Sequence, residues 1–223
     1  MRRQILEQAL ELFDRRGYEQ TTLKHIAEAS GVAIGLAYRY FRRKEDMVLA
    51  LYERLSERVA ATLELPSGSL GTRWAALERA RFRVLAPHRR TLLALVQAAL
   101  DPDGGLGVLS PATADVRARW LALHRRVVEG AEPAMHAPTA IEAAADALYG
   151  LDLLMVLLWT QDRSREARAT LQVITQCARL IDMAAPLLAL PGAAQHLGVL
   201  KNVFQPVGAK SSTGAGAKGK KKE

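Results

Sequence analysis

The segment from residue 22 to residue 41 contains two short helical patterns separated by a glycine, and this arrangement narrows the possible folds more than any other feature of the chain. The first pattern, expected to form a helix over residues 22–29, has Thr21 and Thr22 as candidate N-caps. Its inward stripe consists of Leu23, Ile26 and Ala27. Gly31 can adopt the left-handed conformation that ends this helix and turns the chain into the next. Two short helices joined by such a turn form a helix-turn-helix unit, whose second helix enters the major groove of DNA.

The second helix of this unit is expected to begin near Ala33 and to have one packed side and one exposed side. Helical spacing places three residues on the packed side: Ala37, Tyr40 and Phe41. Four residues form the outward side: Ile34, Gly35, Tyr38 and Arg39. Because residues 42–44 are all basic, this side would offer aromatic and cationic groups to base edges and flanking phosphates. A further helix starting at about Lys44 would also point its first amides at a phosphate.

Residues 2–16 are expected to form a helix that completes a three-helix unit. Their apolar residues recur at helical spacing: Ile5, Leu6, Ala9, Leu10, Leu12 and Phe13. Gly17 stops this helix, and Tyr18 is then placed to contact Phe13, as in a Schellman ending.

Residues 5–51 resemble the DNA-binding domain of the tetracycline-repressor (TetR/AcrR) family of bacterial transcription regulators. The resemblance rests on residues in the expected order and spacing: Ala9, Phe13, Gly17, Tyr18, Thr22, Ile26, Ala27, Gly31, Val32, Gly35, Tyr38, Phe41, Lys44 and Glu45. It covers about the first quarter of the chain. It implies a three-helix DNA-binding domain on an all-helical effector-binding and dimerisation domain. The implied function is a homodimeric regulator, more often a repressor, released from a palindromic operator in double-stranded DNA by an unknown small-molecule effector.

The resemblance also implies DNA contacts at particular positions. Thr22, Tyr38, Tyr40 and Lys44 match positions that usually touch the DNA backbone, and Ile34, Gly35, Tyr38 and Arg39 lie where recognition-helix side chains meet bases. Lys24 faces either solvent or a phosphate. Considered alone, the two tyrosines would be half-buried packing residues, and the ordered pattern around them favours DNA contact instead.

Several positions depart from the family pattern. Ala33 and Arg43 stand where the family commonly has helix-capping residues, and each lost cap would cost about 1 kcal/mol of local helix stability. Ile34 replaces a frequent polar or basic residue, so it can meet a thymine methyl group but cannot make a bidentate hydrogen-bond contact. The basic arm before the first helix is reduced to Arg2 and Arg3, so either minor-groove contacts are weak or the natural start lies upstream.

Beyond residue 46 the sequence predicts helices throughout and shows no strand-like alternation, so the expected fold is all-α. Helices are expected over about 44–63, 72–86, 87–100, 111–129, 139–159 and 165–190. Loops are expected at 101–111 and 130–138, and Thr139 to Glu142 form a capping-box pattern. We divide the chain into a DNA-binding domain (1–46), an effector-binding and dimerisation domain (47–192) and a C-terminal extension (193–223) with a flexible lysine-rich tail from about residue 209.

The last two long helices are expected to mediate assembly. In the helix expected at 139–159, apolar residues recur at alternating spacings of four and three and form a seam. The helix expected at 165–190 has two apolar stripes, so other helices must cover it on two sides. The family implies a four-helix dimer interface from these helices and their symmetry mates. The candidate interface residues are Ile141, Leu148, Met155, Trp159, Ile174 and Ile181.

Asp152 is the one charged residue on the seam of the first of these helices. A carboxylate there either pairs with an arginine or hydroxyl, opens to solvent, or contacts a ligand, because burying it unpaired costs several kcal/mol. The candidate effector pocket combines it with the aromatic residues of the middle helices: Trp74, Phe82, Trp120, His124 and Tyr149. Most of these are expected to be core. The arginines of residues 73–83 and 118–126 are best explained as exposed helix faces.

The formal charge of the chain is +8, and half of it lies in residues 209–223. Net charge therefore does not identify the N-terminal segment as a DNA binder. The lysine-rich tail either tethers the protein to DNA without sequence preference or keeps it soluble. A single cysteine, Cys177, fits a reducing compartment. We expect a cytoplasmic protein without a membrane partner, because no signal-peptide pattern is present and the longest apolar run is short of the ~20 residues a span needs.

The sequence favours neither an enzyme nor a cofactor protein. Phosphate-loop, HExxH, paired-cysteine and GxSxG patterns are absent, and the glycine pair 104–105 follows no strand. His88, His124 and His136 lack metal-ligand spacing with a convincing partner, so no metal site or cofactor is expected. The alternative function is an all-helical protein-interaction adaptor with non-specific DNA affinity. This alternative does not explain the Tyr-Arg-Tyr segment.

Overall fold

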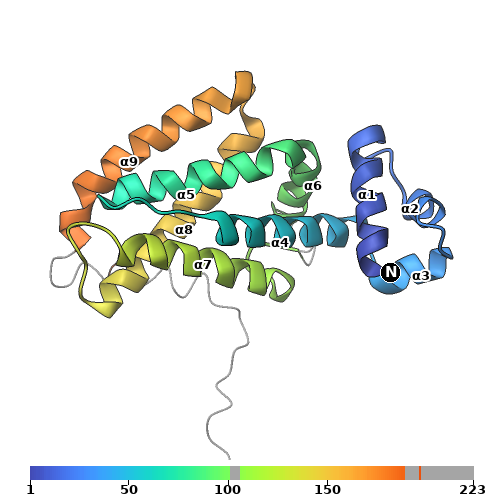
Figure 1. Cartoon of the computed structure of the whole chain (residues 1–223), viewed down its shortest axis with the longest axis horizontal. Helices are drawn as coiled ribbons and strands as arrows, with labels where there is room; N and C mark the ends of the chain where they lie inside the picture. The colour runs from blue at the N-terminus through green and yellow to red at the C-terminus, as the bar shows by residue number, and fades with distance from the viewer. Residues whose placement is uncertain (101–105, 189–195, 197–223) are drawn as a thin grey trace, which may run out of the picture.

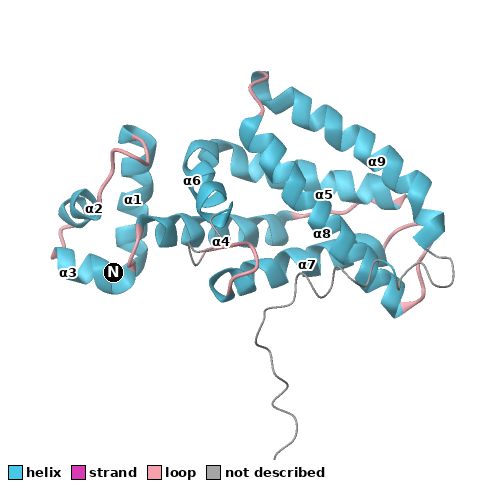
Figure 2. Cartoon of the chain, turned by 180° about the vertical axis from the view of Figure 1, so that it is seen from behind, coloured by secondary structure: helices cyan, strands magenta, loops and turns pink. Residues whose placement is uncertain are grey.

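The computed structural model describes residues 1–100, 106–188 and 196, and the described chain consists of helices and connecting turns without a strand (Figures 1 and 2). Among these residues no helix is sufficiently long and apolar to cross a membrane. The expectation of an all-α fold is confirmed. The second half of the loop expected at 101–111 is described, while the glycine pair 104–105, the end of the last helix beyond residue 188 and the lysine-rich tail lie outside the described residues.

The N-terminal three helices form a small unit at one end of the molecule (Figure 1). They are α1 (Arg2–Arg16), α2 (Leu23–Ala29) and α3 (Ile34–Tyr40). Their apolar stripes meet in a core that includes Ile5, Ala9, Phe13, Ile26, Ala37 and Phe41, each at most 3% exposed. Gly17 ends α1 and Tyr18 contacts Phe13 with ring centroids 5.1 Å apart, as expected. The predicted Schellman motif does not form, because Gly17 has φ 89° and ψ 154°, outside the left-handed helical region.

Helix α4 (Lys44–Thr62) links the two parts of the molecule (Figure 1). It begins beside α3 and continues into the larger bundle, so the expected domain boundary after residue 46 falls within its first turn. Its buried side carries Met47, Val48, Leu51 and Val59, all fully buried. A displacement of α4 in the bundle therefore acts directly on the three-helix unit.

The larger bundle contains α5 (Leu70–Leu85), α6 (Arg89–Leu100), α7 (Ala114–Glu129), α8 (Pro138–Gln161) and α9 (Arg168–Leu188), with short 3-10 turns η1 (Ala86–His88), η2 (Pro111–Thr113) and η3 (Arg165–Ala167). Helix α5 packs against α4, α7 and α9, and α7 packs along α8 (Figures 1 and 2). The observed helices agree with the expected ones to within a few residues. One local expectation is wrong: the capping box at Thr139 does not form, because α8 begins at Pro138 with Ala137 as its N-cap.

Two polar caps hold α9 in this bundle. Asp182 on α9 accepts hydrogen bonds from the Gly71 amide (2.7 Å) and the Ser69 hydroxyl (2.8 Å) at the start of α5. Asp162, between α8 and α9, accepts hydrogen bonds from the amides and hydroxyls of Ser164 and Thr170 at 2.6–2.8 Å. Burial raises the pKa of the Asp162 carboxyl, but these four hydrogen bonds outweigh it and hold that pKa well below its ordinary value.

Candidate nucleic-acid interface and ligand site

A reciprocal cap fixes the start of α2. The Thr22 hydroxyl accepts a hydrogen bond from the His25 amide (3.2 Å), and His25 Nδ1 accepts one from the Thr22 amide (3.3 Å). Thr22 is therefore the N-cap, as expected, and its side chain remains exposed. The contribution of His25 was not expected, because the third helical position of a capping box is usually Glu or Gln.

The turn between α2 and α3 is anchored on both sides. Gly31 has φ 66°, the left-handed conformation expected for it. The buried Ser30 hydroxyl donates to the Ile26 carbonyl (2.7 Å), and the Gln4 side chain of α1 donates to the Ser30 carbonyl (3.2 Å). Ala33 then begins α3 without a side-chain cap, in agreement with the expectation.

Helix α3 exposes most of its surface. Ala37 and Phe41 are buried, while Ile34, Gly35 and Arg39 are exposed together with Tyr38 (49%) and Tyr40 (40%). The expectation that Tyr40 packs against the domain is wrong. Tyr40 is the last helical residue and Phe41 takes an extended conformation (φ −141°, ψ 111°), which turns Phe41 into the core and leaves Tyr40 outside. Two aromatic rings and a guanidinium thus share one accessible surface.

Lys44, at the start of α4, is tied to the end of α1. Its ammonium group donates to the Tyr18 carbonyl (2.9 Å) and lies over the Tyr18 ring at 4.2 Å. The Tyr18 hydroxyl donates to Glu45 (2.7 Å), and burial together with this acceptor raises the pKa of that hydroxyl above its usual value. Lys44 therefore positions α4, and its contact with DNA stays a prediction. Lys24, also predicted to face solvent or a phosphate, is exposed on α2.

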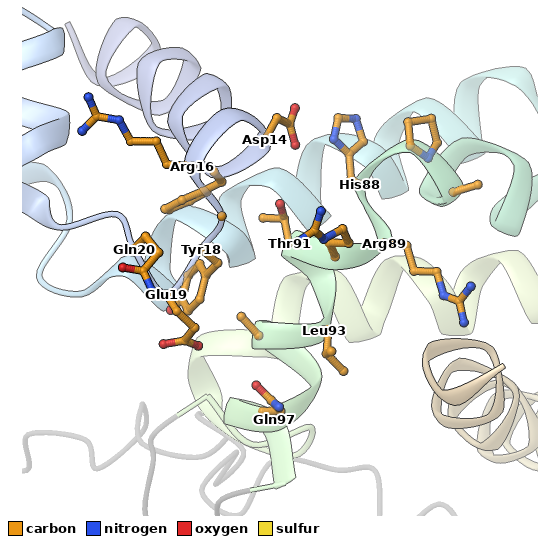
Figure 3. Close-up of a pocket in the computed structure, with 16 residues that line it drawn as sticks. Asp14, Arg16, Tyr18, Glu19, Gln20, His88, Arg89, Thr91, Leu93 and Gln97 are labelled. Atoms are coloured by element: carbon orange, nitrogen blue, oxygen red, sulfur yellow. The ribbon is translucent and has the colours of Figure 1, made fainter. Parts of the chain in front are cut away.

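An open groove of about 680 Å³ separates the three-helix unit from α6 (Figure 3). One wall comes from the end of α1 and residues 17–20, and the other from η1 and α6. Its labelled side chains are largely polar, with Asp14 and Arg16 on one side and His88 and Arg89 on the other (Figure 3). Burial, together with Arg54 and Arg58, lowers the pKa of His88 although Asp14 opposes the shift. The sequence analysis did not identify this groove, since its walls are distant in the chain.

The predicted effector residues fall into separate environments. Trp120 and Tyr149 line a small cavity of about 70 Å³ between α4, α6, α7 and α8. Phe82 instead contacts Trp159 (5.2 Å between ring centroids) and lines a different hollow of about 450 Å³ toward α9. Trp74 is fully buried in the core. The six candidates therefore do not share one cavity.

His124 and Asp152 belong to a buried polar cluster where α5, α7 and α8 meet. Asp152 pairs with Arg81, which also lies 3.6 Å from Glu78. The Arg81 guanidinium lies over the Trp120 ring (4.4 Å) and donates to the Tyr52 hydroxyl on α4 (3.2 Å). Of the three alternatives for Asp152, the structure shows pairing with an arginine.

Burial shifts the ionisation of two cluster members. It raises the pKa of Glu78 to about 7, against the opposing effect of Arg81. It lowers the pKa of His124 to about 3, and Arg81 adds to this effect although a bond to the Trp120 carbonyl opposes it. His124 is consequently neutral at physiological pH.

Two of the arginines expected on exposed helix faces, Arg73 and Arg81, are buried, and so is Arg117, for which no expectation was stated. Arg73 donates to the Val127 and Arg126 carbonyls (both 2.9 Å) at the end of α7, and Arg117 donates to the Val108 carbonyl (2.7 Å). Carbonyls at helix ends and in loops lack intrahelical partners, so a guanidinium can be buried against them. A signal was available for Arg81, which lies in the helical register of the buried Trp74 and Leu77.

His124 lies near two carboxylates whose oxygens could join it in binding a metal, while the expectation of no metal site stays a prediction. Glu78, His124 and Asp152 are all buried, and each offers one ligand atom within 4.8 Å of the others. Sequence spacing could not reveal this group because its members come from three helices.

Four of the six residues predicted for the dimer interface are buried within the chain itself: Leu148, Met155, Trp159 and Ile174. Ile141 and Ile181 are half-buried. The seam of α8 faces its own bundle, so those four assignments are wrong. The exposed large apolar residues of α8 and α9 are instead Leu154, Leu171, Leu180, Met183 and Leu187.

Residues 5–51 match the family described as bacterial regulatory proteins, tetR family. Over 68 residues the chain is 41% identical to the HTH-type transcriptional regulator TcmR of Streptomyces glaucescens. This aligned region covers 30% of each chain. The similarity to curated relatives is thus confined to about a third of their length or less.

Solved structures extend the likeness to the whole fold. The TetR transcriptional regulator from Nitrosomonas europaea has a TM-score of 0.58 at 21% identity and covers 81% of this chain and 97% of its own. FadR from Bacillus subtilis, solved in complex with stearoyl-CoA, has a TM-score of 0.58 at 19% identity and covers 80% and 97%. Residues 5–51 thus match the family model of bacterial regulatory proteins, tetR family, and the described chain shares its fold with solved structures of TetR regulators.

Proposed function

We propose that this protein is a sequence-specific DNA-binding transcription regulator, and more specifically a repressor released by a ligand. The observation that carries the proposal is the exposed face of α3. Tyr38, Arg39 and Tyr40 are exposed there, while the flanking Ala37 and Phe41 are buried in the core. Aromatic and cationic groups on a rigid helix can contact base edges and phosphates together. The names of the curated relatives, which are transcriptional regulators, support the same function.

Dimerisation follows from the size of this surface. Helix α3 has seven residues, so a single copy reads too few base pairs for useful specificity. Two copies related by a two-fold axis would read a palindrome with half-sites about 34–36 Å apart, or a multiple of that spacing. The exposed apolar residues of α8 and α9 support an interface there, because large apolar patches on a folded surface mark association sites.

Ligand response would act through α4 and α6. Helix α4 carries Tyr52 in the buried cluster and Lys44 beside the three-helix unit, and α6 faces that unit across the groove of Figure 3. A ligand that binds one arrangement of the bundle more tightly shifts the separation of the two α3 helices. FadR, a transcriptional regulator of similar fold, was solved in complex with stearoyl-CoA, which supports a small-molecule ligand for this protein as well.

The test is a binding selection with the purified full chain against a pool of genomic fragments. The selection is run at about 50 mM and about 200 mM salt with random DNA as competitor, because non-specific affinity falls steeply over this range. Recovery of a palindromic site that survives the competitor is the expected result. Uniform binding that disappears at the higher salt would contradict sequence-specific regulation and favour electrostatic attraction alone.

A further inference from the structure

The buried polar cluster contains more hydrogen-bonding atoms than its side chains can satisfy. Glu78 on α5, His124 on α7 and Asp152 on α8 are each fully buried, and their ligand atoms lie within 4.8 Å of one another. Arg81 pairs with Asp152 Oδ1 and lies 3.6 Å from Glu78 Oε2. The other oxygens, Glu78 Oε1 and Asp152 Oδ2, have no hydrogen-bond partner among the described residues. Burying a carboxylate oxygen without a hydrogen-bond partner reduces the stability of the fold, so a further ligand at this site would be favourable.

His124 points to the nature of that partner. Its Nδ1 lies 2.8 Å from the Trp120 carbonyl oxygen, which can only accept, so Nδ1 carries the proton. Nε2 then has a free lone pair, is buried, and has no hydrogen-bond partner among the described residues. A backbone carbonyl that fixes an imidazole through its other nitrogen is the usual support of a metal-binding histidine.

Charge also favours a cation. The two carboxylates carry up to two negative charges, against the single positive charge of Arg81. A divalent ion would give a partner to both free oxygens and to the imidazole at once. No second described arginine or lysine is paired with either carboxylate.

The available space is small. The cavity beside the cluster, lined by Tyr52, Trp120 and Tyr149 among others, has a volume of about 70 Å³. A water molecule occupies about 30 Å³ and organic ligands occupy pockets of about 300–1,000 Å³. This cavity is too small for an organic effector, and Glu78, His124 and Asp152 are not among the residues that line it.

We propose that Glu78, His124 and Asp152 bind a divalent transition-metal ion such as Zn²⁺. One imidazole nitrogen with two carboxylate oxygens suits Zn²⁺, Fe²⁺ or Ni²⁺ better than Mg²⁺ or Ca²⁺, which prefer oxygen ligands alone. Metal–ligand bonds of about 2.0–2.2 Å require the three ligand atoms to move closer than in the metal-free arrangement.

Metal binding would change the contacts of α4. A cation bound to the two carboxylates would repel the Arg81 guanidinium, which pairs with Asp152 and donates to the Tyr52 hydroxyl (3.2 Å). Tyr52 belongs to the helix whose first residue, Lys44, is bonded to the three-helix unit. The ion is therefore the effector of this site, a conclusion that rests on the proposed function.

The first experiment measures binding and needs no DNA. The full chain is stripped with a chelator and titrated calorimetrically with ZnCl₂, and MgCl₂ is the comparison ion. We expect one Zn²⁺ site, at least tenfold weaker in His124→Gln and unchanged in His136→Gln, a matched control at an exposed histidine. Equal Zn²⁺ affinity in all three proteins, or no preference for Zn²⁺ over Mg²⁺, would overturn the site.

Folding and coupling are measured separately. His124→Gln leaves the Arg81–Asp152 pair intact, whereas Asp152→Asn breaks it and can unfold the protein. Circular dichroism therefore checks that both variants are folded, and the Zn²⁺ affinity of His124→Gln is the result that tests the metal site. With Co²⁺ in place of Zn²⁺, visible absorption should report imidazole ligation in the wild-type protein and be lost in His124→Gln. Operator affinity of the wild-type protein is then measured once with chelator and once with Zn²⁺. If the two affinities are equal, the ion is not the effector, while the proposed DNA-binding function stands.

Discussion

At the residue scale, exposure separates side chains that maintain the three-helix unit from those available to DNA. Phe41 and Ala37 are buried and fix α3, while Tyr38 is about half exposed (49%). Lys44 lies between these groups, because its ammonium group bonds to the Tyr18 carbonyl. Replacing an outward residue should therefore change DNA binding without changing stability.

We predict that Tyr38→Ala weakens operator binding at least tenfold, the loss expected for about 1–3 kcal/mol of base or phosphate contact. The measurement is fluorescence anisotropy with an operator duplex, alongside thermal unfolding. Leu109→Ala is the matched control, since Leu109 is similarly exposed (44%) and lies in the loop before η2. Unchanged operator affinity in Tyr38→Ala would remove α3 as the reading surface.

At the element scale, the position of α9 depends on close backbone contact with α5. A Cβ atom added at Gly71 would overlap the Ala178 carbonyl of α9, and the Gly71 amide donates to Asp182 of the same helix. The absence of a side chain thus allows the two helices to approach. Neither contact is visible in the sequence, where Gly71 follows a Pro-Ser-Gly stretch and resembles a loop residue.

We predict that Gly71→Ala lowers the free energy of unfolding by about 1–3 kcal/mol, the usual cost of overpacking at a tight contact. Gly35→Ala is the control, because an added Cβ there meets nothing within 4 Å and alanine favours a helix by up to about 1 kcal/mol. Chemical denaturation of both variants tests the prediction. Equal stability of Gly71→Ala and the wild type would mean that α5 and α9 are not closely packed in solution.

At the scale of the whole molecule, assembly depends on side chains that a single chain leaves exposed. Leu180, Met183 and Leu187 are 62%, 75% and 59% exposed, and their spacing of three and four residues places them on one face of α9. Water contact with such a face is unfavourable, so a second copy of the chain is the proposed cover.

Met183→Glu is expected to shift the protein from dimer to monomer and to reduce operator affinity, because a charge in the centre of an apolar interface loses its hydration. Sedimentation velocity gives the oligomeric state, and Leu109→Glu places the same charge away from this face. A Met183→Glu protein that remains a dimer would exclude this part of α9 from the interface.

The local structure of this protein could be predicted from short-range sequence patterns. Periodic apolar residues, the Thr22 cap and the left-handed Gly31 define helices and turns because they depend on neighbours within a few positions. The outward set Ile34, Gly35, Tyr38 and Arg39 followed from the same periodicity, and all four are exposed. Tyr40 was misplaced because the extended backbone at Phe41 ends the helical register one residue earlier.

The contacts between helices could not be predicted in this way. The seam of α8 could equally face its own bundle or a partner, and it packs inside, which buries Met155 and Trp159. Glu78, His124 and Asp152 meet although 28 or more positions separate each from the next, since three helices must pack before their side chains can converge. Helical periodicity specifies a face but not the neighbour that the face meets, and the effector site depends on that neighbour.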